Sequence, residues 1–177
     1  GEDLLITGAG PIGLISVAIC KFMRAKNIVI TDINDYRLAI AKQLGATKTI
    51  NTKKDSIKNS FGELNIKHGF DVGLEMSGNG QAFNEMLSSI YHGGKIVLLG
   101  LLPKSTCINW DNIIFKGLQI KGVYGREMYE TWYKMDQLIK SGLDLSKIIT
   151  HQFPISSFDE AFKVISSGQC GKVVMEW

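Results

Sequence analysis

The stretch Leu4-Leu5-Ile6-Thr7-Gly8-Ala9-Gly10-Pro11-Ile12-Gly13 decides the fold of this chain of 177 residues. It joins an apolar run to a turn of the pattern Gly-x-Gly-x-x-Gly, and a helix-like run follows over residues 12–25. A second apolar run, residues 27–31, leads into Asp32, about 20 residues beyond the last glycine, as in a dinucleotide-binding βαβ unit. The turn alone is weak evidence, because glycine is common in turns. Strand, turn, helix and acid together predict such a unit.

Each residue of the turn has a physical reason to be there. Gly8 allows the tight turn, and Gly10 has no β-carbon, so a pyrophosphate can approach the backbone. Gly13 lets the helix pack closely on the strand. Pro11 suits the first helical turn, where its missing N–H costs nothing. The free N–H groups at the start of the helix favour a bound pyrophosphate.

Asp32 favours NAD over NADP. Its carboxylate would accept hydrogen bonds from the adenosine ribose hydroxyls. A 2′-phosphate about 4 Å away would be repelled by about 4 kcal/mol per charge pair at an effective dielectric of 20. Arg37, one turn into the next expected helix, could instead pair with a phosphate or flank the adenine. The acid has the greater weight in this prediction.

The rest of the chain alternates strand and helix patterns, which predicts an α/β fold with a doubly wound six-stranded parallel sheet (Rossmann fold). The expected strands are residues 4–7, 27–31, 48–51, 70–76, 95–99 and 118–124, and the expected helices are residues 12–25, 35–44, 56–66, 81–91, 110–115 and 128–141. We expect residues 1–142 to form the cofactor-binding domain. Residues 143–177 look like an appendage, with strands at 148–153 and 172–176 and a helix at 157–166.

The ligand crevice of such a sheet lies at the carboxyl ends of its strands. Ser77 follows the fourth expected strand and Leu99-Gly100-Leu101 the fifth, while Val123-Tyr124 end the sixth. Gly100 either lets the backbone approach the nicotinamide riboside or is an ordinary loop glycine, and the sequence leaves both interpretations open. We expect all of these residues at the cofactor.

Composition excludes several function classes. A formal net charge of +3, with no aromatic residues among the clustered lysines, argues against nucleic-acid binding. No apolar run reaches the roughly 18 residues of a membrane span. Three widely spaced cysteines without a Cys-x-x-Cys pair argue against a structural zinc site and for a reducing compartment such as the cytoplasm. The three histidines are scattered, so we expect neither catalytic residues nor metal ligands in this chain.

On the glycine turn 8–13 and segments 30–38, 69–78, 92–94, 115–118, 121–135 and 168–173, the chain resembles the medium-chain, zinc-dependent alcohol dehydrogenase family. The turn marks only the fold. The stretch from Tyr124 to Met135 is more specific, and resembles the members of the family that oxidise L-threonine.

The resemblance implies that Ile12, Asp32, Arg37, Leu99-Gly100-Leu101 and Val123-Tyr124 bind NAD. It also implies oxidation of the 3-hydroxyl of L-threonine to 2-amino-3-ketobutyrate, with a catalytic zinc as Lewis acid and hydride transfer to the nicotinamide. The family's zinc ligands and substrate pocket belong to an amino-terminal half absent from this sequence, to which residues 143–177 would return. The chain also starts at Gly1 without a methionine, so we expect a domain cut from a longer polypeptide that is inactive alone.

The sixth expected strand, residues 118–124, lies at the edge of the sheet and predicts a dimer, because unpaired edge groups invite a second copy. The family forms dimers and tetramers partly through this strand. Lys116 and Lys121 argue against the prediction, since edge lysines often block pairing. Replacing Val123 by proline would test it if the Val123 N–H faced the partner.

Three other functions remain open. The chain could be the NAD-binding portion of a medium-chain dehydrogenase for another polyol or alcohol. It could be a non-catalytic NAD-sensing module, like those that gate potassium channels. It could also be a methyltransferase that uses S-adenosylmethionine, although such sheets usually carry an antiparallel hairpin.

Overall fold

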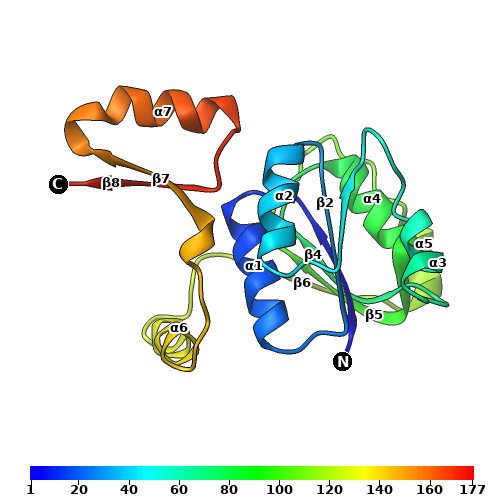
Figure 1. The fold of residues 1–177 in the computed structure, drawn as a ribbon. Coiled ribbons are helices and arrows are strands. Elements are labelled where there is room, and N and C mark those ends of the chain that lie inside the picture. Colours follow the sequence, from blue (N-terminus) through cyan, green and yellow to red (C-terminus); the bar gives the residue numbers. More distant parts are fainter.

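A computed structural model describes residues 1–177, and its main body is a parallel sheet covered by helices on both faces (Figure 1). The strand order is β3-β2-β1-β4-β5-β6, and every neighbouring pair is parallel. The strands are β1 (Asp3–Thr7), β2 (Asn27–Asp32), β3 (Lys48–Asn51), β4 (Phe70–Glu75), β5 (Ile90–Leu98) and β6 (Gln119–Gly122). The predicted doubly wound six-stranded sheet is confirmed. No strand of this sheet forms the antiparallel hairpin expected of a methyltransferase.

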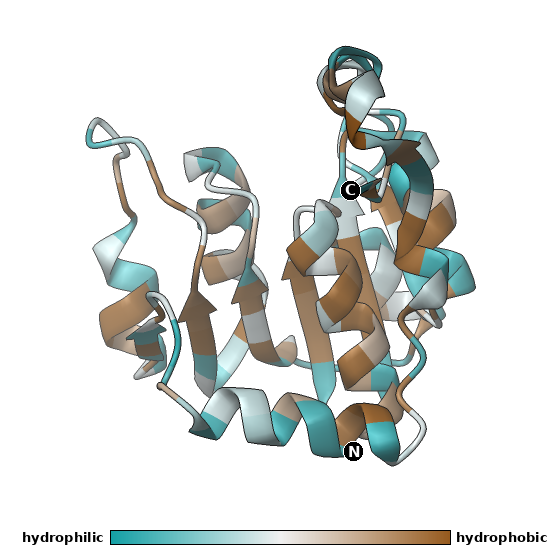
Figure 2. Ribbon diagram, turned by 90° about the vertical axis from the view of Figure 1, so that its left-hand side faces the viewer, coloured by the Kyte–Doolittle hydropathy of each residue, from teal (hydrophilic) through white to brown (hydrophobic).

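Two apolar cores flank the sheet, because successive residues of a strand point to opposite faces. Ile6 of β1 packs with α1 (Pro11–Phe22) and α2 (Asp35–Gln43), whereas its neighbour Leu5 packs with α4 (Gly80–Ser89). The helices α3 (Asn59–Glu63) and α5 (Trp110–Lys116) lie on the same side as α4 (Figure 1). In Figure 2 the central strands are hydrophobic along most of their length, as burial on both faces requires.

The fifth strand begins earlier than the sequence predicted. Gly93 and Gly94 lie inside β5 and do not close the helix expected at 81–91, since α4 already ends at Ser89. A β-carbon on Gly94 would lie 3.0 Å from the carbonyl oxygen of Asp71 in β4. Gly94 therefore permits the close approach of the two strands, where their pairing register shifts.

The sixth strand and the third helix are shorter than expected. β6 ends at Gly122, so Val123 and Tyr124 follow the strand at its carboxyl end and are not part of it. α3 covers only Asn59–Glu63 of the expected 56–66. The last helix of the main body, α6 (Glu130–Lys140), has no buried residue.

The chain beyond residue 142 is first anchored in the main body and then forms a small unit beside it. Leu143 and Ile148 are buried in the core beneath α1 and α2, at the short 3-10 turn Ser146–Ile148. β7 (Ile149–Pro154), a second 3-10 turn (Ile155–Ser157), α7 (Phe158–Ser167) and β8 (Lys172–Glu176) then form a separate unit (Figure 1). β7 and β8 pair in parallel as a two-stranded sheet. That this unit returns to a further domain stays a prediction. None of the helices has the length and apolar character that crossing a membrane requires.

Candidate functional site

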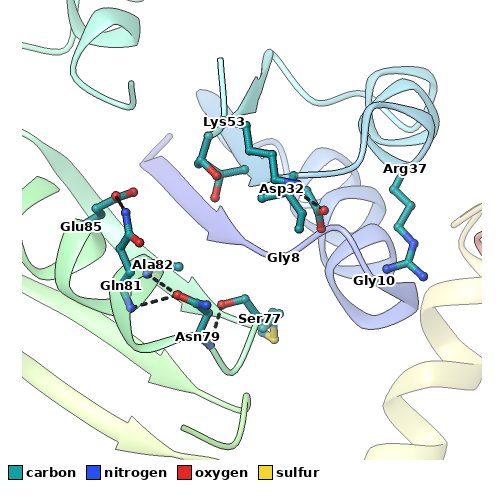
Figure 3. Close-up of a pocket in the computed structure, with 14 residues that line it drawn as sticks. Gly8, Gly10, Asp32, Arg37, Lys53, Ser77, Asn79, Gln81, Ala82 and Glu85 are labelled. Atoms are coloured by element: carbon teal, nitrogen blue, oxygen red, sulfur yellow. Dashed lines mark hydrogen bonds between the residues drawn. The ribbon is translucent and has the colours of Figure 1, made fainter. Parts of the chain in front are cut away.

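The carboxyl ends of β1, β2, β3 and β4 surround a cleft of about 570 Å³ (Figure 3). Five of the predicted cofactor residues line it together: Gly8, Gly10, Asp32, Arg37 and Ser77. The volume lies in the range of small-molecule sites, and the place matches the crevice where ligands of doubly wound sheets bind. The structure thus brings residues from three separate loops to one site. Their role in binding a cofactor stays a prediction.

The glycine turn has the geometry that a close approach to the backbone needs. Gly8 has a φ of +89° and donates its N–H to the carbonyl oxygen of Thr31 over 2.8 Å. A β-carbon on Gly13 would overlap the carbonyl oxygen of Gly8, so the helix could not pack as it does. At Gly10, by contrast, a β-carbon would meet nothing within 4 Å and would project into open space beside the cleft. Gly10 therefore leaves free the space that a pyrophosphate would need.

Asp32 is bound into the backbone that surrounds the cleft. Its Oδ2 accepts the N–H of Ala9 over 2.6 Å, which joins the acid to the glycine turn. Its Oδ1 accepts the N–H groups of Ile33 and Asn34 over 2.7 and 2.9 Å. The carboxylate is thus fixed in place and only half-buried, so it can still accept hydrogen bonds from ribose hydroxyls.

Glu75, which the sequence analysis missed, supports the site without lining the cleft. It is fully buried at the end of β4, and its carboxylate accepts the N–H groups of Ser77 and Gly78 over 2.9 and 3.0 Å and a bond from the Ser77 hydroxyl. The hydroxyl of Thr7 donates to it over 3.4 Å. Glu75 therefore shapes the turn that brings Ser77 to the cleft. An acid within an apolar strand is the signal that could have revealed it.

Gly100 lies where only a glycine fits. A β-carbon there would overlap the carboxylate of Glu75 and the backbone nitrogen of Gly78. Its N–H donates to the carbonyl oxygen of Glu75 over 3.1 Å. The packing of the loop after β5 against the loop after β4 thus explains this glycine. That the backbone at Gly100 approaches a nicotinamide riboside stays a prediction.

The other predicted residues do not line the cleft. Three of them lie at the start of α1: Pro11, Ile12 and Gly13. The other four follow β5 and β6: Leu99, Leu101, Val123 and Tyr124. Leu101 and Tyr124 are almost completely exposed, at 90% and 99%. The exposed pair lies at the same edge of the sheet as the cleft, because the carboxyl ends of parallel strands share one edge.

Nine further residues line the cleft: Thr31, Ile33, Thr52, Lys53, Met76, Asn79, Gln81, Ala82 and Glu85. In Figure 3 Gln81 and Glu85 of α4 lie across the cleft from Asp32, with Lys53 between the two walls. Gln81 donates its amide N–H to Glu85 over 3.0 Å. Thr52 and Lys53 are the first two residues after β3, and Asn79 caps α4, so the positions after each strand were the signal available in the sequence.

Beside the cleft, Asp35 carries a fixed negative charge. A hydrogen bond from Lys54, and a second from Asn51, lower the pKa of this exposed carboxyl. No three His, Cys, Asp or Glu side chains gather where they could hold a metal ion. The residues of this chain therefore do not offer the donor set of a zinc site.

Comparison with known proteins relates the chain to dehydrogenases. A family model described as "Zinc-binding dehydrogenase" matches residues 11–141. The L-threonine 3-dehydrogenases of Chromobacterium violaceum and Xanthomonas axonopodis pv. citri are 58% and 55% identical to this chain over 177 residues. Each alignment covers 100% of this chain and 52% of the relative, so the chain spans about half the length of these curated relatives.

Solved structures share the fold. A protein described as a short chain alcohol dehydrogenase (RspB) from Escherichia coli CFT073, complexed with cofactor NADH, superposes with a TM-score of 0.87 at 26% identity, over 100% of this chain and 52% of that one. L-idonate 5-dehydrogenase from Escherichia coli K-12 superposes with a TM-score of 0.86 at 25% identity, over 100% and 50%.

Proposed function

The chain belongs to the zinc-binding dehydrogenase family, and from this premise we propose that it is the NAD-binding portion of an L-threonine 3-dehydrogenase. The observation that carries the proposal is the cleft itself, which joins an open glycine turn to a fixed acid at the end of β2. The substrate is proposed from the relatives at 53–58% identity, which are named L-threonine 3-dehydrogenase.

Each part of the cleft would hold one part of NAD. The backbone N–H groups after Gly10 would bind the pyrophosphate at the start of α1, where the helix dipole favours negative charge. Asp32 would accept the hydroxyls of the adenosine ribose. The open edge at Leu99–Leu101 and Val123–Tyr124 would receive the nicotinamide riboside. NAD supplies the hydride acceptor, and this chain would bind and orient it.

The complete enzyme would transfer a hydride from C3 of L-threonine to NAD⁺ and release the proton of the 3-hydroxyl, forming 2-amino-3-ketobutyrate and NADH. We propose that the residues holding zinc and the substrate lie in a part of the enzyme outside these 177 residues. The complete enzyme would form a homo-oligomer, and the edge strand β6 would join two copies.

Calorimetric titration tests the proposal. NAD should bind to the chain more tightly than NADP, and S-adenosylmethionine should not bind. Equal affinities for NAD and NADP would contradict the role of Asp32, and binding of S-adenosylmethionine alone would overturn the proposed class. A second assay adds L-threonine and NAD to the chain, where NADH formation would show that catalytic residues have been overlooked.

A further inference from the structure

The C-terminal part of the chain binds two side chains of the main body, Arg37, which lines the cleft, and Asn34, which lies two residues after Asp32. Asn34 donates from Nδ2 to the carbonyl oxygen of Gly168 over 3.0 Å. Arg37 donates from Nε to the carbonyl oxygen of Cys170 over 3.3 Å. The partners are 134 and 133 residues apart in sequence. Both acceptors lie in the turn 168–171, which connects α7 to β8.

Asn34 connects this turn to the acid of the cleft. Its backbone N–H donates to Asp32 Oδ1 over 2.9 Å. Its side-chain oxygen accepts the N–H of Arg37 over 3.3 Å and so caps α2, while its side-chain nitrogen reaches Gly168. Both ends of the amide are therefore used, one for the helix and one for the distant turn.

Arg37 is oriented by the same turn. It lines the cleft, and its bond to Cys170 uses only Nε. Neither terminal nitrogen of the guanidinium has a hydrogen-bond partner in the protein, so both are available to a ligand. Because a guanidinium is planar, fixing Nε also limits the directions in which these nitrogens can point.

The turn is built to hold one shape. Gly168 ends α7 in the left-handed region, with φ of +73°, and a β-carbon there would lie 3.1 Å from Asn34 Nδ2. Cys170 and Gly171 are buried, and the N–H of Gly171 donates to the hydroxyl of Thr150 in β7 over 3.0 Å. The turn is therefore bonded into the β7–α7–β8 unit.

We propose that the turn 168–171 positions the loop that carries Asp32 and Arg37 in the cofactor site. Asn34 is the positioning residue that connects the turn to this loop. Binding of NAD and placement of the β7–α7–β8 unit are then coupled. By linkage, a turn that stabilises the nucleotide-binding loop is itself stabilised by the bound nucleotide to the same extent. This inference rests on the proposed function, because it takes NAD as the ligand.

The main variant is Asn34→Ser. Serine caps a helix about as well as asparagine, but its side chain is too short to reach Gly168, and the charge is unchanged. The net worth of one neutral hydrogen bond corresponds to about twofold to tenfold in an equilibrium constant, so the Kd for NAD should rise by about that factor. Amide exchange at residues 168–171 should become faster.

A second pair of variants distinguishes an effect of the turn on NAD binding from a general loss of protein stability. Gly168→Ala forces a left-handed residue to carry a β-carbon next to Asn34, although Gly168 does not line the cleft. Gly117→Ala is the matched control, since Gly117 ends α5 with φ of +60° and has no neighbour within 4 Å. Gly168→Ala should weaken NAD binding, whereas Gly117→Ala should not.

Hydrogen exchange by mass spectrometry gives the second readout. NAD should slow exchange at residues 168–171 in the unmodified chain, and this protection should shrink in Asn34→Ser. Unchanged NAD affinity in both Asn34→Ser and Gly168→Ala, or no protection of the turn by NAD, would overturn the inference. A chain that does not bind NAD at all would contradict the proposed function. In that case, amide exchange of residues 168–171 measured without nucleotide would still test the contact. Equal rates in the unmodified chain and in Asn34→Ser would show that Asn34 does not hold the turn.

Discussion

At the scale of single residues, two glycines of one turn perform different tasks. Gly13 is required by the fold, because a β-carbon there would overlap the carbonyl oxygen of Gly8. Gly10 has extended backbone angles that alanine can adopt, and open space surrounds it. Replacement by alanine should therefore lower stability at Gly13 and weaken ligand binding at Gly10.

Gly13→Ala should lower the free energy of unfolding by about 1–3 kcal/mol, as overpacking does. Gly10→Ala should change it by less than about 0.5 kcal/mol, yet weaken NAD binding at least tenfold by filling the pyrophosphate space. Urea denaturation and calorimetry measure the two effects. A Gly10→Ala chain that binds NAD normally would place the pyrophosphate elsewhere.

Asp32→Ser should narrow the preference for NAD over NADP. Removing the carboxylate removes a repulsion of the order of 4 kcal/mol per charge pair from a 2′-phosphate, so the ratio of the two Kd values should fall at least tenfold. Asp35→Ser is the control, since it removes the same charge from an exposed residue that does not line the cleft. An equal shift in both variants would assign the preference to general charge and not to Asp32.

At the scale of elements, a lysine closes the end of a neighbouring helix. Lys116 of α5 donates from Nζ to the carbonyl oxygens of Leu87, Ser88 and Ile90 over 2.9, 2.8 and 3.0 Å. These oxygens lie at the C-terminus of α4, where positive charge is favourable. Burial lowers the pKa of Lys116. Lys116 therefore gives no evidence against pairing at the sheet edge, because its ammonium group is bound to the carbonyl oxygens of α4.

Lys116→Met should lower the free energy of unfolding by about 1–3 kcal/mol, because it leaves carbonyl oxygens at the end of α4 without a donor. Lys121→Met, on the exposed edge strand, is the matched control and should cost less than about 0.5 kcal/mol. Equal urea midpoints for the two variants would show that the three bonds do not contribute to stability.

At the scale of the whole molecule, β6 is a free edge of the sheet, and its four residues are exposed. The N–H of Val123 donates to the carbonyl oxygen of Leu98 over 2.9 Å, so it faces β5 and not a partner. Proline at Val123 would therefore damage the fold, and the condition for that test, a Val123 N–H that faces the partner, is not met. Because N–H groups alternate along a strand, the Ile120 N–H faces the open edge.

We expect a dimer of the unmodified chain in light scattering at high micromolar concentration. Ile120→Pro should convert it to a monomer, since proline removes an outward donor and is tolerated on edge strands. Ile120→Val keeps the donor and should remain dimeric. A monomeric mass for the unmodified chain would contradict an interface through β6.

The sequence by itself determined the sheet and the part of the site that depends on short-range backbone geometry. Apolar runs and the glycine spacing predicted six parallel strands, and the need for a tight, open turn identified Gly8, Gly10 and Asp32 at one cleft. These signals are local, because a tight turn requires a positive φ, as at Gly8, within one short segment of the chain.

Only the tertiary structure decided which distant residues meet there. Thr52, Lys53 and Gln81 reach the cleft through strand order and register. The bonds from Asn34 to Gly168 and from Arg37 to Cys170 join segments whose sequences carry no mark of each other. A lysine or a turn carbonyl is compatible with many neighbours, so packing selects its partner. The backbone requirements were therefore readable in the sequence, whereas the side-chain partners were set by the fold.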